Sequence, residues 1–308
     1  MTLREVAFNW QQDKEMYVKK SSFAAYSLLM QNHLLPEFGD KEEITELDLQ
    51  NFLMRKLRGN LSQKTVKDMF IVLKMIIKFG IKYKIWDYMP PFEDLKYPVN
   101  HQEYKLKTLN TAEYKKIVNH IKENFTFRAL GILIVLSTGM RIGEICALAW
   151  EDIDLDSGVI HIRKTIQRIY TVSPNGIKKT ELIIDTPKTV NSARDVPISP
   201  DLMKILKPLM KILKSDYYVL TNDIRPTEPR TYRSFYEIYM QNLGIKKLNF
   251  HGLRHSFATQ CIAAKVDVKT VSSILGHSNI STTFNLYVHP SDEDKRGAVN
   301  QLFKSLKI

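Results

Sequence analysis

The sequence predicts a mainly α-helical protein with a small antiparallel β-sheet, an α+β fold in two domains. The length of 308 residues exceeds the roughly 100–200 residues of a usual single domain. Apolar side chains recur three and four positions apart over most of the chain, which is the spacing of amphipathic helices. Residues 159–196 instead hold alternating, β-branched segments typical of strands. We therefore expect a helical domain over residues 1–100 and a second domain over residues 104–308.

The clearest helix of the first domain is predicted over residues 62–84. Its apolar stripe consists of Val66, Met69, Phe70, Leu73, Ile76, Ile77 and Ile81. Another side carries Lys67, Lys74, Lys78 and Lys82, because spacings of seven, eleven and fifteen residues approach whole helical turns. Two interpretations of these four residues, here called the lysine face, stay open. They form either a solvated surface or a surface that contacts nucleic-acid phosphates.

The predicted boundary between the domains lies near residue 100. Helical periodicity fails over residues 85–107, where Pro90, Pro91 and Pro98 stand among charged and aromatic side chains. Such composition is typical of an interdomain connection. We place the linker near residues 86–107.

The second domain begins with helices and returns to helices after a β region. Periodicity resumes at Thr111, runs through residues 128–136, breaks at Gly139 and continues over residues 141–149. The predicted antiparallel strands include residues 159–162 and 182–184, which flank a Ser-Pro-Asn-Gly turn at 173–176. After Pro200 the pattern is helical again.

The charge of the chain favours a polyanionic partner. Lysine and arginine outnumber aspartate and glutamate by 45 to 33, which gives a formal charge of +12. A positive charge of this size attracts nucleic acid over long range. It also suits a basic protein without such a partner, so the motifs must decide.

The cysteines and the apolar runs bear on location. Cys146 and Cys261 lie far apart in apolar helical patterns, as expected of reduced thiols. The most apolar stretch, residues 129–136, is far shorter than the ~20 residues that span a bilayer. The N-terminus lacks the apolar core of a signal peptide. We expect a cytoplasmic protein with no membrane partner.

Two C-terminal motifs carry the candidate chemistry. His251 and Arg254 are three positions apart and share one side of a predicted helix. His277 follows Gly276 in the corner between two helices, and Tyr287 ends a short helix ten residues later. Each of these residues alone would be interpreted as a surface or packing residue. Their occurrence together at these spacings indicates a functional site.

A third motif lies upstream, after a glycine turn. Arg141 is predicted to begin a helix, and Glu144, one turn on, is placed to brace its guanidinium. For Arg141 alone, a surface role is the simpler account.

Together these motifs resemble the tyrosine recombinase (phage integrase) family. The first box, Thr-Gly-x-Arg-x-x-Glu, corresponds to residues 138–144, and the second, His-x-Leu-Arg-His, to residues 251–255. Leu-Gly-His at 275–277 and Tyr287 follow in order. The resemblance covers about residues 104–308, while the first hundred residues are similar to the family's core-binding domain in size and position. The chain has no room for a separate arm-site-binding domain before those helices, so it is either a simpler recombinase or a shortened one.

The resemblance implies a role for each motif residue. Arg141, Arg254 and His277 would contact the scissile phosphate, His251 would assist proton handling, and Tyr287 would be the nucleophile. Lys188, in Thr-Pro-Lys-Thr, matches the family's hairpin lysine, the general acid for the leaving 5′ oxygen; Lys178 and Lys179 lie close by. Fixed cations stabilise the charge that a phosphodiester gains under attack. We therefore expect neither cofactor nor metal.

The implied function is site-specific DNA recombination through a 3′-phosphotyrosine, for integration or excision of a mobile element. The implied partners are a double-stranded recombination site, a homo-tetramer on synapsed DNA, and accessory DNA-bending or directionality proteins. The apolar stripe Val299, Leu302, Phe303 and Leu306 is expected to dock on a neighbouring protomer. Four alternatives stay open: a chromosome-dimer-resolving recombinase, a type IB topoisomerase, a catalytically silent DNA-binding regulator, and a metal-dependent transposase or nuclease.

Overall fold

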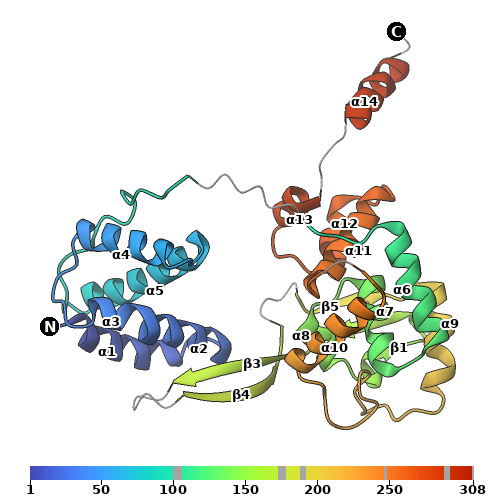
Figure 1. The fold of residues 1–308 in the computed structure, drawn as a ribbon, viewed down its shortest axis with the longest axis horizontal. Coiled ribbons are helices and arrows are strands. Elements are labelled where there is room, and N and C mark those ends of the chain that lie inside the picture. The colour runs from blue at the N-terminus through green and yellow to red at the C-terminus, as the bar shows by residue number, and fades with distance from the viewer. Residues whose placement is uncertain (100–105, 173–177, 188–191, 246–247, 288–291, 307–308) are drawn as a thin grey trace. The chain divides into compact units, whose positions relative to one another are not determined.

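The chain forms two compact units, each built mainly from helices (Figure 1). The structure, a computed structural model, describes residues 1–99, 106–172, 178–187, 192–245, 248–287 and 292–306. The first unit comprises residues 1–103 and 168–182, and the second comprises residues 104–167 and 183–308. The expected fold class, mainly α with small antiparallel sheets, is confirmed.

The first unit packs its helices around one apolar core. Its elements are α1 (Leu3–Glu15), α2 (Lys20–Leu29), a π-helix (Met30–Leu34), α3 (Leu35–Phe38), α4 (Glu46–Arg58) and α5 (Gln63–Lys82). The Ser62 side chain caps α5 by accepting a hydrogen bond from the amide of Thr65 at 3.1 Å. The predicted stripe of α5 is buried from Val66 to Ile77, and Ile81 is partly buried.

Residues 86–98 pack onto the first unit although they form neither helix nor strand. Trp86 and Leu95 are buried in its core. The side chain of Gln50 exchanges two hydrogen bonds, of 2.9 and 3.1 Å, with the backbone of Lys96. The hydrophobic periodicity of the sequence does not predict this packing. The segment is held by single buried apolar side chains and by hydrogen bonds from the Gln50 amide, which leave no repeating pattern.

The second unit is organised around the buried helix α7. Its helices are α6 (Thr111–Glu123), α7 (Phe127–Thr138), α8 (Ile142–Ala147), the 3₁₀ helix Trp150–Asp152, α9 (Pro200–Met210), α10 (Pro229–Asn242), α11 (His251–Ala263), α12 (Val268–Leu275), α13 (Ile280–Tyr287) and α14 (Asp292–Ser305). The helix expected over residues 141–149 ends earlier, at Ala147. The chain turns extended at Leu148, and the amide of Trp150 then bonds the carbonyl of Tyr217 at 3.0 Å.

The strands form two small sheets rather than one. Strands β1 (Ile153–Asp154), β2 (Val159–Ile162) and β5 (Arg194–Pro197) make an antiparallel sheet in the order β1-β2-β5. Strands β3 (Thr165–Val172) and β4 (Lys178–Asp185) make a separate pair. The prediction that residues 159–162 and 182–184 share one sheet is therefore wrong, because β2 pairs with β5 instead. The predicted turn at 173–176 lies outside the described residues.

The pairing of β2 with β5 aims one charged side chain inward. Arg194 pairs with Ile162, and alternate residues of β5 are buried, beginning with Arg194 itself. An arginine on the buried face of a strand needs partners, and helices α8 and α12 supply them.

In the described ranges, no helix is long and apolar enough to cross a bilayer.

Candidate active site

Arg141 stands at the entrance of α8, after a left-handed turn. Gly139 has φ +66°, and a Cβ there would lie 2.7 Å from the side chain of Leu275, so the turn requires glycine. The backbone amide of Arg141 donates to Glu144 at 2.8 Å, and its Nη1 donates to the same carboxylate at 2.8 Å. The Arg141 side chain keeps 35% of its surface exposed. The guanidinium is thus braced, as expected, and still accessible.

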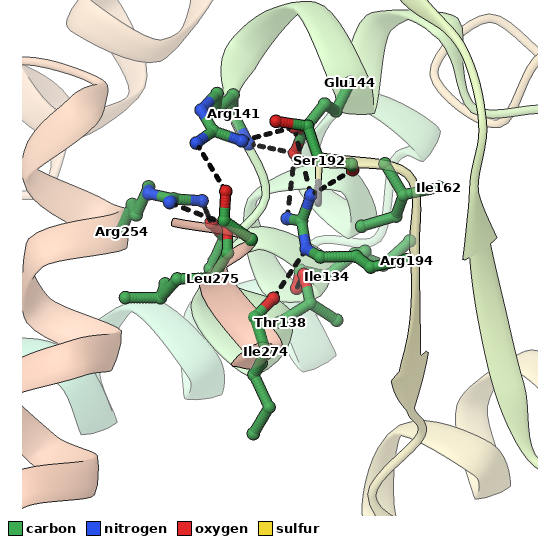
Figure 2. Close-up of polar contacts among 12 residues, drawn as sticks. Ile134, Thr138, Arg141, Glu144, Ile162, Ser192, Arg194, Arg254, Ile274 and Leu275 are labelled. Carbon is green, nitrogen blue, oxygen red and sulfur yellow. Dashed lines mark hydrogen bonds and ion pairs between the residues drawn. The ribbon is translucent and has the colours of Figure 1, made fainter. Parts of the chain in front are cut away.

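Glu144 links Arg141 to a second arginine, Arg194 (Figure 2). Both Glu144 and Arg194 are buried, and the Arg194 fork donates to the two carboxylate oxygens at 3.1 and 3.0 Å. Burial raises the pKa of Glu144, but the hydrogen bond and charge of Arg194 and the charge of Arg141 outweigh it and lower the pKa. The carboxylate is therefore ionised and fixes the position of Arg141.

Arg254 is the most deeply buried cation of the cluster. It lies on α11 and is only 1% exposed. Nη1 donates to the carbonyl of Gly139 and Nη2 to the carbonyl of Leu275, both at 2.8 Å. Burial, followed by the charge of Arg141, lowers the pKa of Arg254 to about 9, which leaves the guanidinium charged at neutral pH. Two carbonyl dipoles do not cancel a full charge, so this position favours an added anion.

Backbone carbonyls at the C-terminal end of α12 accept hydrogen bonds from all three arginines. Arg194 donates to the carbonyl of Ile274 at 2.5 Å, Arg254 to that of Leu275 at 2.8 Å, and Arg141 to that of Gly276 at 3.4 Å. The last carbonyls of a helix lack intrahelical partners and carry partial negative charge. These three successive carbonyls therefore act as a common support for the cations (Figure 2).

His277 follows this helix end, in the corner predicted for it. Gly276 closes α12 with φ +66°, and His277 Nδ1 lies 2.7 Å from the hydroxyl of Thr283. Burial, followed by the charges of Arg254 and Arg141, lowers the pKa of His277 to about 4. The imidazole is neutral at neutral pH and can donate one hydrogen bond.

Tyr287 is a buried phenol whose hydroxyl meets a histidine. Its side chain is 7% exposed and packs with Ala258, Val271 and Leu275. Its Oη lies 2.5 Å from Nδ1 of His255 on α11. Burial raises the pKa of Tyr287, while the charge of Arg254 acts to lower it.

His251 completes the cluster at its solvent side. It lies on the exposed face of α11, and its ring meets that of His255 edge-on, with centroids 4.6 Å apart. Desolvation by neighbouring side chains, then the charges of His255 and Arg254, lowers the pKa of His251.

The structure brings together six residues expected from the sequence: Arg141, Glu144, His251, Arg254, His277 and Tyr287. Lys188 lies outside the described residues, so its role stays a prediction. The sequence reasoning missed Arg194 and His255. The signals were present: Arg194 alternates with the inward Val196, and His255 lies one helical turn after His251.

The lysine face belongs to the first unit. Nζ of Lys67 lies 4.7 Å from the ring centre of Tyr97, and Nζ of Lys74 lies 5.5 Å from that of Phe92. Lys67 and Lys78 are exposed. Rings from residues 86–98 thus border the lysine face, and its contact with phosphates stays a prediction.

The described parts of the chain contain no group of three or more histidine, cysteine, aspartate or glutamate side chains arranged to hold a metal ion.

The family follows from a comparison with known proteins. The sequence model of the Phage integrase family matches residues 107–294. The chain belongs to this family. The model of the phage integrase N-terminal SAM-like domain matches residues 2–57. The recombinase class expected from the motifs is thereby confirmed, and the protein is a DNA strand-transferring enzyme.

The curated relatives of this chain include proteins named as tyrosine recombinases and as integrases. The tyrosine recombinase XerC-like protein of Caldanaerobacter subterraneus is 27% identical, over 98% of this chain and 83% of the relative. The ICEBs1 integrase of Bacillus subtilis is 23% identical, over 89% of this chain and 75% of the relative.

Solved structures share the fold of the integrase. The Tn1549 transposon integrase in complex with a circular intermediate DNA has a TM-score of 0.76 at 21% identity, covering 98% of this chain and 99% of that one. A lambda integrase dimer bound to a COC′ core site has a TM-score of 0.65 at 17% identity, covering 94% and 77%. At these identities the likeness concerns the fold.

Proposed function

We propose that this integrase cleaves and rejoins double-stranded DNA at specific sites through a 3′-phosphotyrosine on Tyr287. The observation that carries the proposal is the grouping of Tyr287 with Arg141, Arg254 and the neutral His277. Arg254 has carbonyl partners, and the described residues place no carboxylate within ion-pair distance of it. A cationic position of this kind suits a phosphodiester.

The proposed reaction needs stabilisation of the negative charge that the phosphate gains, and a covalent intermediate that conserves the energy of the broken bond. Tyr287 gives its phenol proton to a base and its Oη bonds to phosphorus, the bond to the 5′ oxygen breaks, and that oxygen takes a proton from a general acid, the proposed role of Lys188. Arg141 and Arg254 stabilise the added negative charge, and His277 donates a hydrogen bond to it. The phosphotyrosine retains the energy of the broken bond, so a 5′ hydroxyl reverses the step without nucleotide hydrolysis.

We further propose that the integrase serves a mobile element. The named relatives that support this include the ICEBs1 integrase and the Tn554 transposase A, and the Tn1549 integrase shares the fold. Resolution of chromosome dimers is the second candidate, favoured by the XerC-like relative that covers 98% of the chain. Strand exchange between the ends of a circular element and a separate target duplex would favour the first; exchange confined to two identical chromosomal sites would favour the second.

A homo-tetramer on two synapsed DNA sites is the proposed assembly, in a cytoplasmic setting. A lambda integrase that shares the fold was solved as a tetramer bound to a Holliday junction. Helix α14 supports the same assembly here, because Val299, Leu302 and Phe303 each expose about half of their surface. Such an apolar stripe is typical of an interaction surface. Accessory DNA-bending or directionality proteins remain an expectation.

Replacing Tyr287 with phenylalanine is expected to abolish covalent attachment to DNA while leaving DNA binding intact. The substitution removes only the attacking oxygen. The assay is a nicked suicide duplex, from which the released fragment diffuses away and the adduct accumulates. Tyr217→Phe is a matched control, since the hydroxyl of Tyr217 contacts Lys214. Wild-type adduct should form in the presence of EDTA.

Three outcomes contradict this assignment. An adduct that persists in Tyr287→Phe would place the nucleophile elsewhere. Cleavage that strictly requires Mg²⁺ would favour metal-dependent chemistry, and specific binding without any adduct would favour the silent regulator.

Replacing Lys67, Lys74, Lys78 and Lys82 with glutamine is expected to flatten the salt dependence of DNA affinity. Each lysine that neutralises a phosphate releases counterions, and the logarithmic slope falls by about 0.9 per lost contact. A control variant removes the same charge from the exposed Lys115, Lys116, Lys122 and Lys207 of the second unit. Equal slopes for the two variants would mean that the lysine face is merely solvated.

A further inference from the structure

The hydroxyl of Tyr287 is held by a histidine to which the motif comparison gives no role. The 2.5 Å contact joins Tyr287 Oη on α13 to His255 Nδ1 on α11. His251, the motif histidine expected to handle protons, reaches this pair only through the ring of His255, edge-on at 4.6 Å. The atom nearest the phenol proton therefore belongs to His255.

The surroundings of His255 set the charge state of its ring, which decides whether Nδ1 can accept this hydrogen bond. The charged and titratable groups that face it are His251 and Arg254 on its own helix and Tyr287 on α13. Burial, followed by the charge of Arg254, lowers the pKa of His255, so its ring is neutral at neutral pH. A neutral ring carries one proton, and with that proton on Nε2 the lone pair of Nδ1 accepts the phenol O–H.

Solvent is poorly placed to take the same proton. Tyr287 is 7% exposed, and its ring packs among Ala258, Val271 and Leu275. A buried phenol ionises reluctantly, as the raised pKa of Tyr287 indicates, so a fixed acceptor lowers the barrier. Arg254 lies near enough to act on the phenol, and its charge favours the phenolate that develops.

We infer that His255 is the general base that takes the proton of Tyr287 during attack on the phosphate. The Tyr287 O–H bond breaks and an Nδ1–H bond forms at His255. The oxygen lone pair forms the O–P bond, the P–O5′ bond breaks, and the general acid protonates the leaving 5′ oxygen. In religation the departing phenolate recovers the proton from His255. The inference rests on the proposed function, because it takes Tyr287 as the nucleophile.

The test compares His255→Ala, His255→Asn and wild type in single-turnover adduct formation on the suicide duplex. Loss of a general base lowers rates by about 10²–10⁴-fold, and we expect at least the lower limit for His255→Ala. Asparagine places an amide oxygen near the position of Nδ1, so it can accept the hydrogen bond but cannot take the proton. His255→Asn should therefore stay nearly as slow as His255→Ala.

Two further readouts separate general-base catalysis from a structural role and from general-acid catalysis. The deficit of His255→Ala should shrink as pH rises, because hydroxide can then deprotonate Tyr287; a structural defect would persist at every pH. A substrate with a bridging 5′ sulfur, whose leaving group needs no proton, should leave the deficit unchanged. Thermal unfolding and DNA affinity of each variant verify that it is folded.

Several outcomes overturn the inference. These are a wild-type rate in His255→Ala, full recovery in His255→Asn, a deficit that is constant with pH, and rescue by the sulfur substrate. Failure of the proposed function would look different: the wild type would form no adduct, or Tyr287→Phe would retain it.

Discussion

Replacing Arg254 with lysine is expected to lower the rate of covalent adduct formation by about 100-fold or more. Removing one donor that stabilises a developing oxyanion costs about 10²–10³ in rate. Arg254 uses two separate nitrogens to bond the carbonyls of Gly139 and Leu275, each at 2.8 Å. Lysine keeps the charge but has a single nitrogen, so it cannot hold both carbonyls and also present a fork to the phosphate.

Single-turnover cleavage of the suicide duplex measures this effect, and DNA affinity should fall much less. Arg225→Lys is the matched control, because Arg225 is an exposed arginine of the same unit. Thermal unfolding shows whether the buried substitution also disturbs the fold. A rate within a few-fold of wild type in a folded Arg254→Lys protein would contradict the assignment of Arg254 to the transition state.

Replacing Glu144 with alanine is expected to lower the free energy of unfolding by about 3–5 kcal/mol, the cost of breaking a buried ion pair. Arg194 would keep its charge with its side chain only 6% exposed, and Arg141 would lose its brace. The double variant Glu144→Gln with Arg194→Met should be less destabilised than the sum of its single changes, because it leaves no unpaired charge.

Urea unfolding at several pH values checks this prediction and also shows how the stability contributed by Glu144 changes with pH. The folded-state pKa of Glu144 lies below its ordinary value. Its ionisation therefore stabilises the fold fully above the ordinary carboxyl pKa, and this stabilisation is lost as pH falls through the lowered value. In Glu144→Ala this part of the acid sensitivity should disappear. If Glu144→Ala lowers the free energy of unfolding by less than about 1 kcal/mol, Arg194 finds solvent or another partner.

The sequence predicted those parts of the fold and site that rest on local periodicity and spacing. The helix after Ser62 follows from its apolar repeat, and Gly139 and Gly276 mark turns because of their position after helical patterns. The helix side shared by His251 and Arg254 followed from their spacing. Their grouping with Arg141 was available only through the family resemblance, since no local pattern joins residues more than a hundred positions apart.

The remaining features depend on tertiary pairing. Residues 159–162 alternate equally well for any neighbouring strand, so their partner β5 could not be chosen from the pattern. Arg194 looks like a surface residue until β5 pairs with β2 and turns it toward Glu144. His255 was read as part of a motif, and its partner Tyr287 lies 32 residues away on another helix.

The arrangement at the end of α12 has a consequence for how the integrase tolerates change. Arg141, Arg194 and Arg254 come from three different elements, yet each bonds a successive carbonyl of residues 274–276. A shift of this one helix end, even by a fraction of an ångström, would displace all three guanidinium groups together. The core-facing side chains Val271 and Leu275, which are fully buried, set the height of that helix end. Apolar packing behind the cations thus governs the alignment of the whole set, and we expect substitutions at these two positions to affect the chemistry as well as the stability.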